Sequence, residues 1–385
     1  MRDDTLELIR RLIAFPTISA DGNAELIAFV CDYLAEWPAR VQLFRHPHEP
    51  KANLLATFGP EGVPGLMLSG HSDVVPVAGQ AWSRDPFDAW IDGARLYGRG
   101  ACDMKGFLGL MLAAAPTMAS ADLRRPIHLA ISYDEEVGCS GVRSLVDHLS
   151  GLAVKPAFCL VGEPTDMRIT TGHKGILAVR TAFTGRPAHS SNPEAGASAA
   201  MAAARFALWL DTLAARLREA ECDVGFTPPY TTVNLGRMLA GEAVNIVAEH
   251  AELIWEVRPI PATDPQPLID EARRHAEALV ATLKPQAPDA CMAFDILAEA
   301  PALTPLNDNP GETLLKRLLA TNTTNRVAFA TEAGLFQQRA GIPALVCGPG
   351  SIEQAHTADE FVTLDQLDQA ADLIDRLIDW ACAPV

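Results

Sequence analysis

The spacing of apolar residues predicts alternating helices and strands over the first 160 residues. Apolar side chains recur every three or four positions within 6–13 and again within 26–34, which is typical of helices that cover a core with one face. Continuous apolar runs predict short buried strands at 53–57, 66–70, 127–133 and 157–161. Segments 105–118 and 140–149, which lie between these strands, are predicted to be helical. The alternation indicates an α/β layer with a mixed, largely parallel sheet flanked by helices.

The pattern changes near residue 175. The segment "GILAVRTAF" predicts a strand and the Ala-rich stretch 195–218 predicts a long helix. Strands with short connections follow, then a helix and a last strand, at 231–236, 244–248, 251–258, 264–282 and 291–297. This order predicts a compact α+β block in which helices cover an antiparallel sheet.

The α/β pattern returns after about residue 300, with the predicted strand "ALVCG" and a closing helix over 364–381. We therefore predict a first domain formed by 1–175 and 293–385 and interrupted by a second, smaller domain at 176–292. A chain of 385 residues has ample length for two domains.

Charge and composition narrow the classes of partner. The formal net charge of −17 argues against nucleic acid and against an anionic membrane surface, both of which attract basic proteins. The eight cysteines are scattered without a CxxC pair, which argues against a thiolate zinc site and favours reduced thiols in the cytoplasm. The first residues lack the apolar core of a signal peptide, and no apolar run reaches membrane-spanning length.

Polar side chains capable of chemistry follow three of the predicted strands. Open α/β sheets bind ligands outside the carboxyl ends of their strands, so we expect these side chains at one edge of the sheet. The loop "LYGRGACDMKG" and the C-terminal segment "EQAHTADE" add one candidate each. The candidates are His71, Asp73, Asp134, Glu135, Glu136, Glu163, Asp103 and His356.

Each candidate alone has an ordinary explanation: a structural histidine, a solvated 134–136 loop, or a helix cap at Asp103. Carboxylates that converge repel one another unless they are protonated or bind cations. Histidines and carboxylates without cysteine suit zinc, with manganese or cobalt as alternatives. Because Asp73 follows His71 by two residues in an extended segment, its carboxylate can orient the imidazole.

Glu135 and Glu136 point in opposite directions if the segment is extended. One of them can then bind metal while the other transfers a proton. The sequence alone leaves open which glutamate takes which role.

Several segments occur in the order known from one enzyme family. They include "SGHSDVVPV", "LYGRGACDMKG", "DEEVGCSG", "GEPT", "HKG", "GRPAHSS" and "AHTADEFV". The chain resembles the dinuclear-zinc amidohydrolases, which include acetylornithine deacetylases, succinyl-diaminopimelate desuccinylases, aminoacylases and peptidases. The resemblance spans nearly the full length. It implies a zinc-peptidase-like catalytic domain, an inserted dimerisation (lid) domain, two zinc ions per subunit (cobalt or manganese as substitutes) and a homodimer.

The resemblance also implies residue roles. His71, Asp103 and Glu163 are similar to the ligands of one zinc ion, with Asp103 as the bridging carboxylate and a cis peptide often following it. Glu136 and His356 are similar to the ligands of the second ion, and Glu135 to the general base. His189 in "GRPAHSS" is implied to stabilise the oxyanion in the active site of the other subunit, whereas the residues alone favour a surface histidine.

Substrate contacts are predicted in both domains. Arg258, at the end of "AELIWEVR", suits capture of a carboxylate, and the resemblance pairs it with Asn245; a salt bridge with Glu256 or Glu252 is the alternative. The resemblance implies that Thr331 and Glu332 lie near the acyl or side-chain pocket, where the Glu332 carboxylate would attract the ammonium of an ornithine derivative. The last two candidates are Gly348 and Gly350, in a predicted turn after "ALVC". They either offer backbone groups to the substrate or only form a tight turn.

The segments "FTPPYTTVNLGRMLAGEAVNIVAEH" and "ATEAGLF" most resemble the deacetylases of the family. They imply that the chain hydrolyses N2-acetyl-L-ornithine to ornithine and acetate in arginine biosynthesis. The alternatives within the family are another N-acyl amino acid deacylase, the desuccinylase and a dipeptidase. Two alternatives are not enzymes: a catalytically silent binding protein, and an acidic structural protein whose carboxylates are only solvated.

Overall fold

The structure, a computed structural model that describes residues 2–384, divides into two compact units. The first unit contains the described residues up to Gly172, together with Leu303–Arg326 and the residues from Thr331 onwards. The second contains His173–Ala302 and Val327–Ala330. The predicted insertion ended at 292, ten residues earlier than the long second-unit segment, because the strand at Cys291–Ala300 belongs to the sheet of the second unit throughout.

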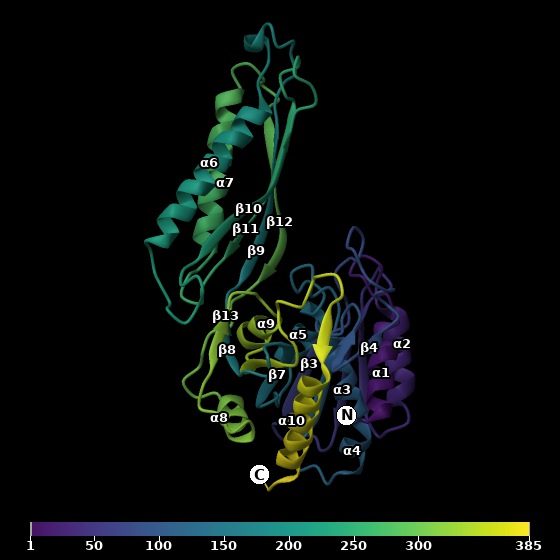
Figure 1. The fold of residues 1–385 in the computed structure, drawn as a ribbon. Helices are drawn as coiled ribbons and strands as arrows, with labels where there is room; N and C mark the ends of the chain where they lie inside the picture. Colours follow the sequence, from purple (N-terminus) through teal and green to yellow (C-terminus); the bar gives the residue numbers. More distant parts are fainter. Residues whose placement is uncertain (1, 385) are drawn as a thin grey trace. The chain divides into compact units, whose positions relative to one another are not determined.

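A mixed eight-stranded sheet forms the centre of the first unit (Figure 1). The four middle strands, β6, β3, β7 and β14, are parallel to their neighbours in that group, whereas the β1–β2, β2–β6 and β14–β8 pairs are antiparallel. In spatial order the strands are β1 (Arg40–Arg45), β2 (Ala52–Phe58), β6 (Ile127–Ser132), β3 (Leu66–His71), β7 (Phe158–Pro164), β14 (Ala344–Gly348), β8 (Thr170–His173) and β13 (Asn325–Val327).

Helices flank this sheet and fill the space against it. Most of the first-unit core lies between the sheet and the helices that begin the chain, follow Asp103 and end the chain. The helices are α1 (Asp3–Ile13), α2 (Ala24–Leu34), α3 (Lys105–Ala113), α4 (Ala115–Ser120), α5 (Arg143–Ser150), α8 (Pro310–Leu318), α9 (Ala333–Gln338) and α10 (Leu364–Cys382). A small separate sheet has the order β15 (Phe361–Thr363), β5 (Arg95–Tyr97) and β4 (Trp90–Asp92).

Close packing of α3 on the sheet depends on two glycines in the strands. A Cβ at Gly70 of β3 would come within 2.7 Å of the Met104 side chain, and one at Gly162 of β7 within 2.0 Å of Phe107. The absence of a side chain at both positions lets α3 approach the strands directly. The helix predicted at 105–118 is divided after Ala113, where α4 begins with Pro116 in its first turn.

The second unit is an antiparallel sheet covered on one face by α6 (Ala199–Arg218) and α7 (Gln266–Leu283), which lie side by side in Figure 1. Alternate strand residues such as Val179 and Trp255 are buried in the core of this unit. The strands, in spatial order, are β10 (Thr232–Ala240), β11 (His250–Arg258), β9 (Ile176–Thr184) and β12 (Cys291–Ala300), and a short 3-10 helix, η1, spans Pro193–Ala195.

One predicted strand of this unit is wrong. Residues 244–248 form a loop in which Ile246 makes an isolated bridge to His189, and Val244 is fully exposed. An apolar run that pairs with no neighbouring strand over its length and has no core beneath it does not form a sheet strand.

The parallel strands bring their carboxyl ends to the same edge of the first sheet. β3 ends at His71, β6 at Ser132, β7 at Pro164 and β14 at Gly348. The loops that leave these strands therefore share one region of space, as the sequence predicted. Among residues 2–384, no helix is both long enough and apolar enough to cross a membrane.

Candidate metal centre

The strand ends and two loops of the first unit bring histidines and carboxylates into one buried cluster. His71 is the last residue of β3 and Glu163 lies in β7, while Glu136 belongs to the loop that follows β6. Asp103 precedes α3 and is followed by a cis peptide bond, which agrees with the family resemblance. His71, Asp103 and Glu163 are each no more than 5% exposed, so their charges have little access to water.

Asp103 faces a different histidine with each of its carboxylate oxygens. Its Oδ1 lies 2.9 Å from Nε2 of His71, and its Oδ2 lies 3.3 Å from Nε2 of His356. Glu136 contacts the second histidine at 2.9 Å, and Glu163 lies 3.7 Å from the first. Asp103 thus stands between two groups of ligand atoms, which is the position that a carboxylate shared by two cations requires.

Two groups of three residues could each hold a metal ion, because the three ligand atoms within each group lie within 4.8 Å of one another. One group is His71, Asp103 and Glu136, and the other is His71, Glu135 and Glu163. Nitrogen and carboxylate oxygen in this proportion are suitable donors for zinc and for similar divalent cations.

Electrostatics show that this cluster needs positive charge. Burial, followed by the charge of Asp103, raises the pKa of Glu163 well above its ordinary value. The same two causes raise the pKa of Glu136 to about 7. Burial alone would lower the pKa of His71, but the charge of Glu163, the hydrogen bond with Asp103 and the nearby Asp73 carboxylate outweigh it and raise the pKa well above the usual range. Hydrogen bonds with Asp103 and Glu136 raise the pKa of His356 to about 10.

Glu136 and Glu163 therefore take up protons, and the two histidines hold theirs, at pH values where ordinary side chains would not. Divalent cations supply the same positive charge without protons. In addition, Oε1 of Glu136 is buried without a hydrogen-bond partner within residues 2–384. A buried carboxylate oxygen that lacks a donor is available to a cation, so the residues fit a metal centre.

Asp73 contacts His71 through its backbone and not, as the sequence predicted, through its carboxylate. The Nδ1 atom of His71 lies 2.9 Å from the backbone carbonyl of Asp73, whereas the carboxylate is 3.6 Å away. That carboxylate instead accepts hydrogen bonds from Ser19 Oγ at 2.7 Å and from the backbone N–H groups of Glu135 and Glu136 at 3.2 and 3.3 Å. Asp73 thus holds the imidazole through its backbone and the 135–136 loop through its side chain.

The two adjacent glutamates have different environments. Glu136 faces His356, whereas Oε1 of Glu135 accepts a hydrogen bond from the buried Cys139 thiol at 3.3 Å. Burial raises the pKa of Glu135 well above its ordinary value, and the charge of Glu136 raises it further. This difference favours Glu136 as the metal ligand and leaves Glu135 for proton transfer.

The residues predicted to contact substrate in the first unit are enclosed by protein. Thr331 is fully buried, and its Oγ1 accepts a hydrogen bond from Ala333 N at the start of α9. Glu332 is 1% exposed, both of its carboxylate oxygens are buried without a hydrogen-bond partner within residues 2–384, and burial raises its pKa to about 7. Contact between Glu332 and a ligand ammonium stays a prediction, and it requires the carboxyl group to become accessible.

The 348–350 segment is a tight turn whose amides are already used. Gly348 N donates to Thr165 Oγ1 at 3.2 Å, and Gly350 N donates to Oε1 of Gln366. Gly350 also has a φ of +89°, and a Cβ there would come within 2.3 Å of the Cys102 sulfur. These contacts favour the structural explanation of both glycines over the predicted contact with substrate.

The remaining predicted residues belong to the second unit. The segments at 188–190 and 245–247 pair with each other, so His189 and Asn245 lie side by side. Arg258 is at the opposite end of β11, where it forms a salt bridge with Glu256 at 3.1 Å. The eight residue steps of β11 span roughly 27 Å, so Asn245 and Arg258 of one chain cannot bind the same small carboxylate.

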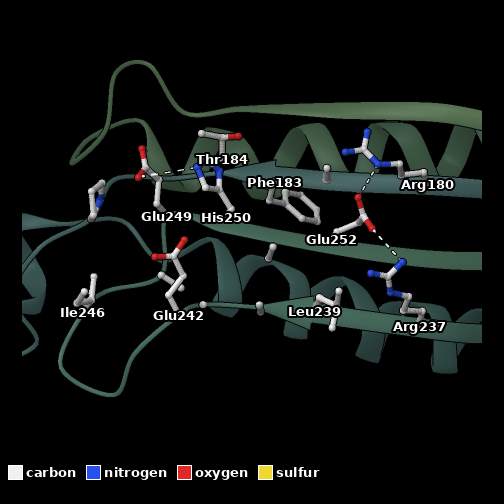
Figure 2. Close-up of a pocket in the computed structure, with 16 residues that line it drawn as sticks. Arg180, Phe183, Thr184, Arg237, Leu239, Glu242, Ile246, Glu249, His250 and Glu252 are labelled. Atoms are coloured by element: carbon white, nitrogen blue, oxygen red, sulfur yellow. Dashed lines mark hydrogen bonds and ion pairs between the residues drawn. The ribbon is translucent and has the colours of Figure 1, made fainter.

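A cavity of about 630 Å³ lies beside β9, β10 and β11 in the second unit (Figure 2). Most of its charged side chains contact one another, whereas Glu242 stands apart from them. Arg180 donates to Glu252 at 2.6 Å, Arg237 lies 4.0 Å from the same carboxylate, and His250 lies 3.9 Å from Glu249. Because these charges are compensated within the cavity wall, we assign no ligand to it.

Several residues that hold the cluster in place cannot be recognised from the sequence pattern. Arg99 and Glu360 occur in the segments "LYGRGACDMKG" and "AHTADEFV", whose sequence alone assigns them no role. In the structure both are 1% exposed, and they form an ion pair at 2.6 Å beside the backbone of Asp103. Side-chain contacts that connect residues about 260 positions apart have no periodicity that a sequence pattern can reveal.

Comparison with known proteins agrees with the site. The sequence profile of peptidase family M20/M25/M40 matches residues 67–380. An acetylornithine deacetylase from Proteus mirabilis is 33% identical over 384 residues, which cover 98% of this chain and 96% of the relative. One from Edwardsiella ictaluri is 34% identical over 98% of this chain and 97% of its own length.

Solved structures show the same fold. An M20 family metallo-carboxypeptidase from Sulfolobus solfataricus aligns with a TM-score of 0.79 and 18% identity, over 99% of this chain and 100% of its own. A dinuclear metal-binding M20 peptidase from Bacillus subtilis aligns with a TM-score of 0.64 and 16% identity, over 97% and 96% of the two chains. The predicted fold class is thereby confirmed. The chain belongs to peptidase family M20/M25/M40, and it is a metal-dependent hydrolase.

Proposed function

We propose that this member of family M20/M25/M40 hydrolyses the N-acetyl amide of N2-acetyl-L-ornithine to give ornithine and acetate. The observation that carries the reaction type is the Asp103 carboxylate, which faces His71 with one oxygen and His356 with the other. The substrate follows from the relatives, since acetylornithine deacetylases match 98% of the chain. Formation of ornithine places the reaction in arginine biosynthesis.

We assign two zinc ions to the centre, with cobalt and manganese as substitutes. His71 and Glu163 belong to one ion and Glu136 and His356 to the other, while Asp103 is shared. When bound, such cations act as Lewis acids that polarise an amide carbonyl and lower the pKa of a water molecule.

Glu135 is the proposed general base. The Cys139 thiol donates to its Oε1, which leaves Oε2 as the oxygen that takes up a proton from water. A carboxyl group whose pKa is raised by burial holds this proton near neutral pH and then gives it to the departing amine. Asp73 keeps Glu135 in place through the hydrogen bond from the backbone N–H of that residue.

We also propose a homodimer in which the second unit contributes to the partner's active site. Asn245 and His189 lie together at one end of the second unit, whereas Arg258 is roughly 27 Å or more from Asn245. Capture of one substrate by all three residues therefore needs two chains. In this arrangement Arg258 binds the substrate carboxylate, and His189 of the partner chain stabilises the oxyanion. A cytoplasmic location is proposed from the scattered free cysteines.

The deciding experiment measures acetate release from N2-acetyl-L-ornithine by metal-free protein, before and after zinc is added. N-succinyl-diaminopimelate, other N-acetyl amino acids and dipeptides are assayed beside it. We expect zinc to restore activity with preference for acetylornithine. Preference for another acyl amino acid would keep the metal centre and replace the substrate.

Two further outcomes separate the enzyme from non-enzymatic alternatives. A protein that binds two zinc ions and cleaves none of these amides would be a silent binding protein. A protein whose thermal stability is the same with and without zinc would have merely solvated carboxylates, because binding to the native state must raise stability. We expect zinc to raise the unfolding temperature by several degrees.

A further inference from the structure

His356 is part of an irregular segment, residues 349–360, which we call the His356 loop. The loop contains neither a helix nor a strand, and His356 and Asp359 have φ values of +62° and +54°. The His356 side chain is 47% exposed, so packing on its own does not fix it. A metal ligand in such a loop needs other contacts to hold its backbone.

Gln80 supplies such a contact. Its Nε2 donates to the backbone carbonyl of His356 at 2.8 Å. Its Oε1 accepts hydrogen bonds from Arg99 Nη2 at 2.5 Å and from Trp82 Nε1 at 3.0 Å. This arrangement fixes the orientation of the amide, because the reversed amide would place NH₂ against two donors and oxygen against a carbonyl.

Arg99 connects Gln80 to the other end of the metal centre. Its Nη1 donates to Oε2 of Glu360 at 2.6 Å, and both side chains are almost completely buried. Oε1 of Glu360 accepts the backbone N–H groups of Cys102 and Asp103 at 2.9 and 3.0 Å. A buried ion pair with its remaining oxygen also satisfied is a rigid connection.

These contacts form a closed path around one half of the centre. The path starts at the Asp103 backbone, passes through Glu360, Arg99 and Gln80, and ends at the His356 backbone. The side chains of Asp103 and His356 complete it, with 3.3 Å between their nearest atoms. In this path Gln80 is the only side chain that touches the backbone of His356.

We propose that Gln80 is a positioning residue that holds His356 in place beside Asp103 and thereby sets the affinity of the cation shared by these two ligands. The proposal rests on the metal centre of the proposed function, but not on its substrate. It gives Gln80 no contact with the reacting atoms. The other cation, which we assign to His71, Glu163 and the shared Asp103, has no contact with His356, so we expect it to keep its affinity when Gln80 is changed.

The test is a titration of metal-free, full-length protein with Zn²⁺ against a chelator of known affinity. Gln80→Ala removes all the contacts of the amide. Gln80→Glu keeps the acceptor for Arg99 and Trp82 and removes only the donor to His356. For both variants we expect one of the two zinc ions to bind about 10- to 100-fold more weakly and the other to bind as in the wild type.

The added charge of Gln80→Glu sharpens the test, because a carboxylate near the centre would by itself tighten the binding of a cation. Weaker binding in this variant therefore reports the lost hydrogen bond. Gln369→Ala is the matched control, since it deletes an exposed glutamine amide of α10 that donates a hydrogen bond to Asp365 at 2.7 Å. We expect this variant to bind both ions as the wild type does.

A double mutant tests whether Gln80 acts through His356. Once His356→Ala has weakened the same ion, adding Gln80→Ala should change the zinc affinity less than twofold. Wild-type affinity for both ions in folded Gln80→Ala and Gln80→Glu, verified by circular dichroism, would overturn the proposal. Equal weakening of both ions would overturn it as well. A wild-type protein that binds no zinc would instead refute the metal centre itself.

Discussion

Glu135 and Glu136 are neighbours in sequence but differ in what surrounds their carboxyl groups. Glu136 lies 2.9 Å from the His356 ring, whereas Glu135 accepts the Cys139 thiol. We expect Glu135→Gln to lower kcat about 10²- to 10⁴-fold, because the amide cannot take up a proton in the reaction. Zinc content, measured by mass spectrometry of dialysed protein, should remain at the wild-type value.

Glu136→Gln is the companion variant. It removes the carboxylate that we assign as a metal ligand, so it should lower zinc affinity as well as kcat. An unchanged kcat in Glu135→Gln, or loss of zinc in that variant, would show that the roles of the two glutamates are assigned wrongly.

The environment of His128 in β6 predicts that the folded protein loses stability in acid. Its Nδ1 lies 2.9 Å from Thr57 Oγ1, and burial, helped by the charge of Arg40, lowers the pKa of His128 to about 4. In the unfolded chain the pKa is about 6.5, so below that value the unfolded state binds the proton more readily. The stability from neutral His128 is therefore complete above pH 6.5 and is lost as the pH falls towards 4.

The size of this effect follows from the shift. One pKa unit corresponds to about 1.4 kcal/mol, so a shift from about 6.5 to about 4 predicts a loss of about 2–3 kcal/mol between pH 7 and pH 4. Urea unfolding of the wild type and of His128→Gln across this pH range measures the loss of unfolding free energy. The loss in the variant should be smaller by the amount that His128 contributes. Parallel pH profiles for the two proteins would contradict the assignment.

At this scale the sequence predicted residue types better than contacts. The spacing of His71, Asp103 and the 134–136 acids was enough to place them at one edge of the sheet. It was not enough to show that His71 contacts the carbonyl of Asp73 rather than its carboxylate, since that depends on the local turn of the chain. The amides of Gly348 and Gly350 are similarly occupied by partners that are distant in sequence.

At the scale of secondary-structure elements, α3 carries the Asp103 loop and packs tightly on α1. A Cβ at Gly109 would come within 2.4 Å of the Ile9 side chain and 3.2 Å of its Cα. We expect Gly109→Ala to destabilise the protein by about 1–3 kcal/mol in urea unfolding, because overpacking exceeds the gain of up to about 1 kcal/mol in helix propensity.

Two variants check that the cause is packing. Ile9→Ala removes the atom that Gly109→Ala would meet, so the double mutant should be more stable than the sum of the single effects predicts. Gly151→Ala, whose Cβ would meet its nearest atom at 3.6 Å, should change stability little. Additive effects in the double mutant would contradict close packing of α1 on α3.

The elements that sequence predicted best have a strong internal pattern. "ALVCG" is β14 at Ala344–Gly348, and the closing helix is α10 at Leu364–Cys382, within one residue of the prediction. The strand predicted at 244–248 has a similar apolar run, yet Val244 is fully exposed. Periodicity identifies an apolar segment, but only the neighbouring strands decide whether a sheet includes it.

At the scale of the whole molecule, the second unit offers an open edge for association. β10 is one of the two edge strands of its sheet, and Met238 and Leu239 are 39% and 51% exposed on it. An edge strand presents unpaired backbone groups, and apolar side chains there favour pairing with another chain. The separation of Asn245 from Arg258 gives an independent reason for two chains, because a small substrate cannot span that distance.

We therefore expect the wild type to be a dimer by light scattering after size-exclusion chromatography, and Met238→Lys/Leu239→Lys to shift towards the monomer, because charge on an edge strand opposes pairing. If the partner supplies His189 and Asn245, kcat/KM should fall with dissociation while zinc content is unchanged. Val154→Lys, at a 40% exposed position of the first unit, should remain dimeric and active. A monomeric wild type with full activity would exclude both the dimer and a catalytic role for the partner chain.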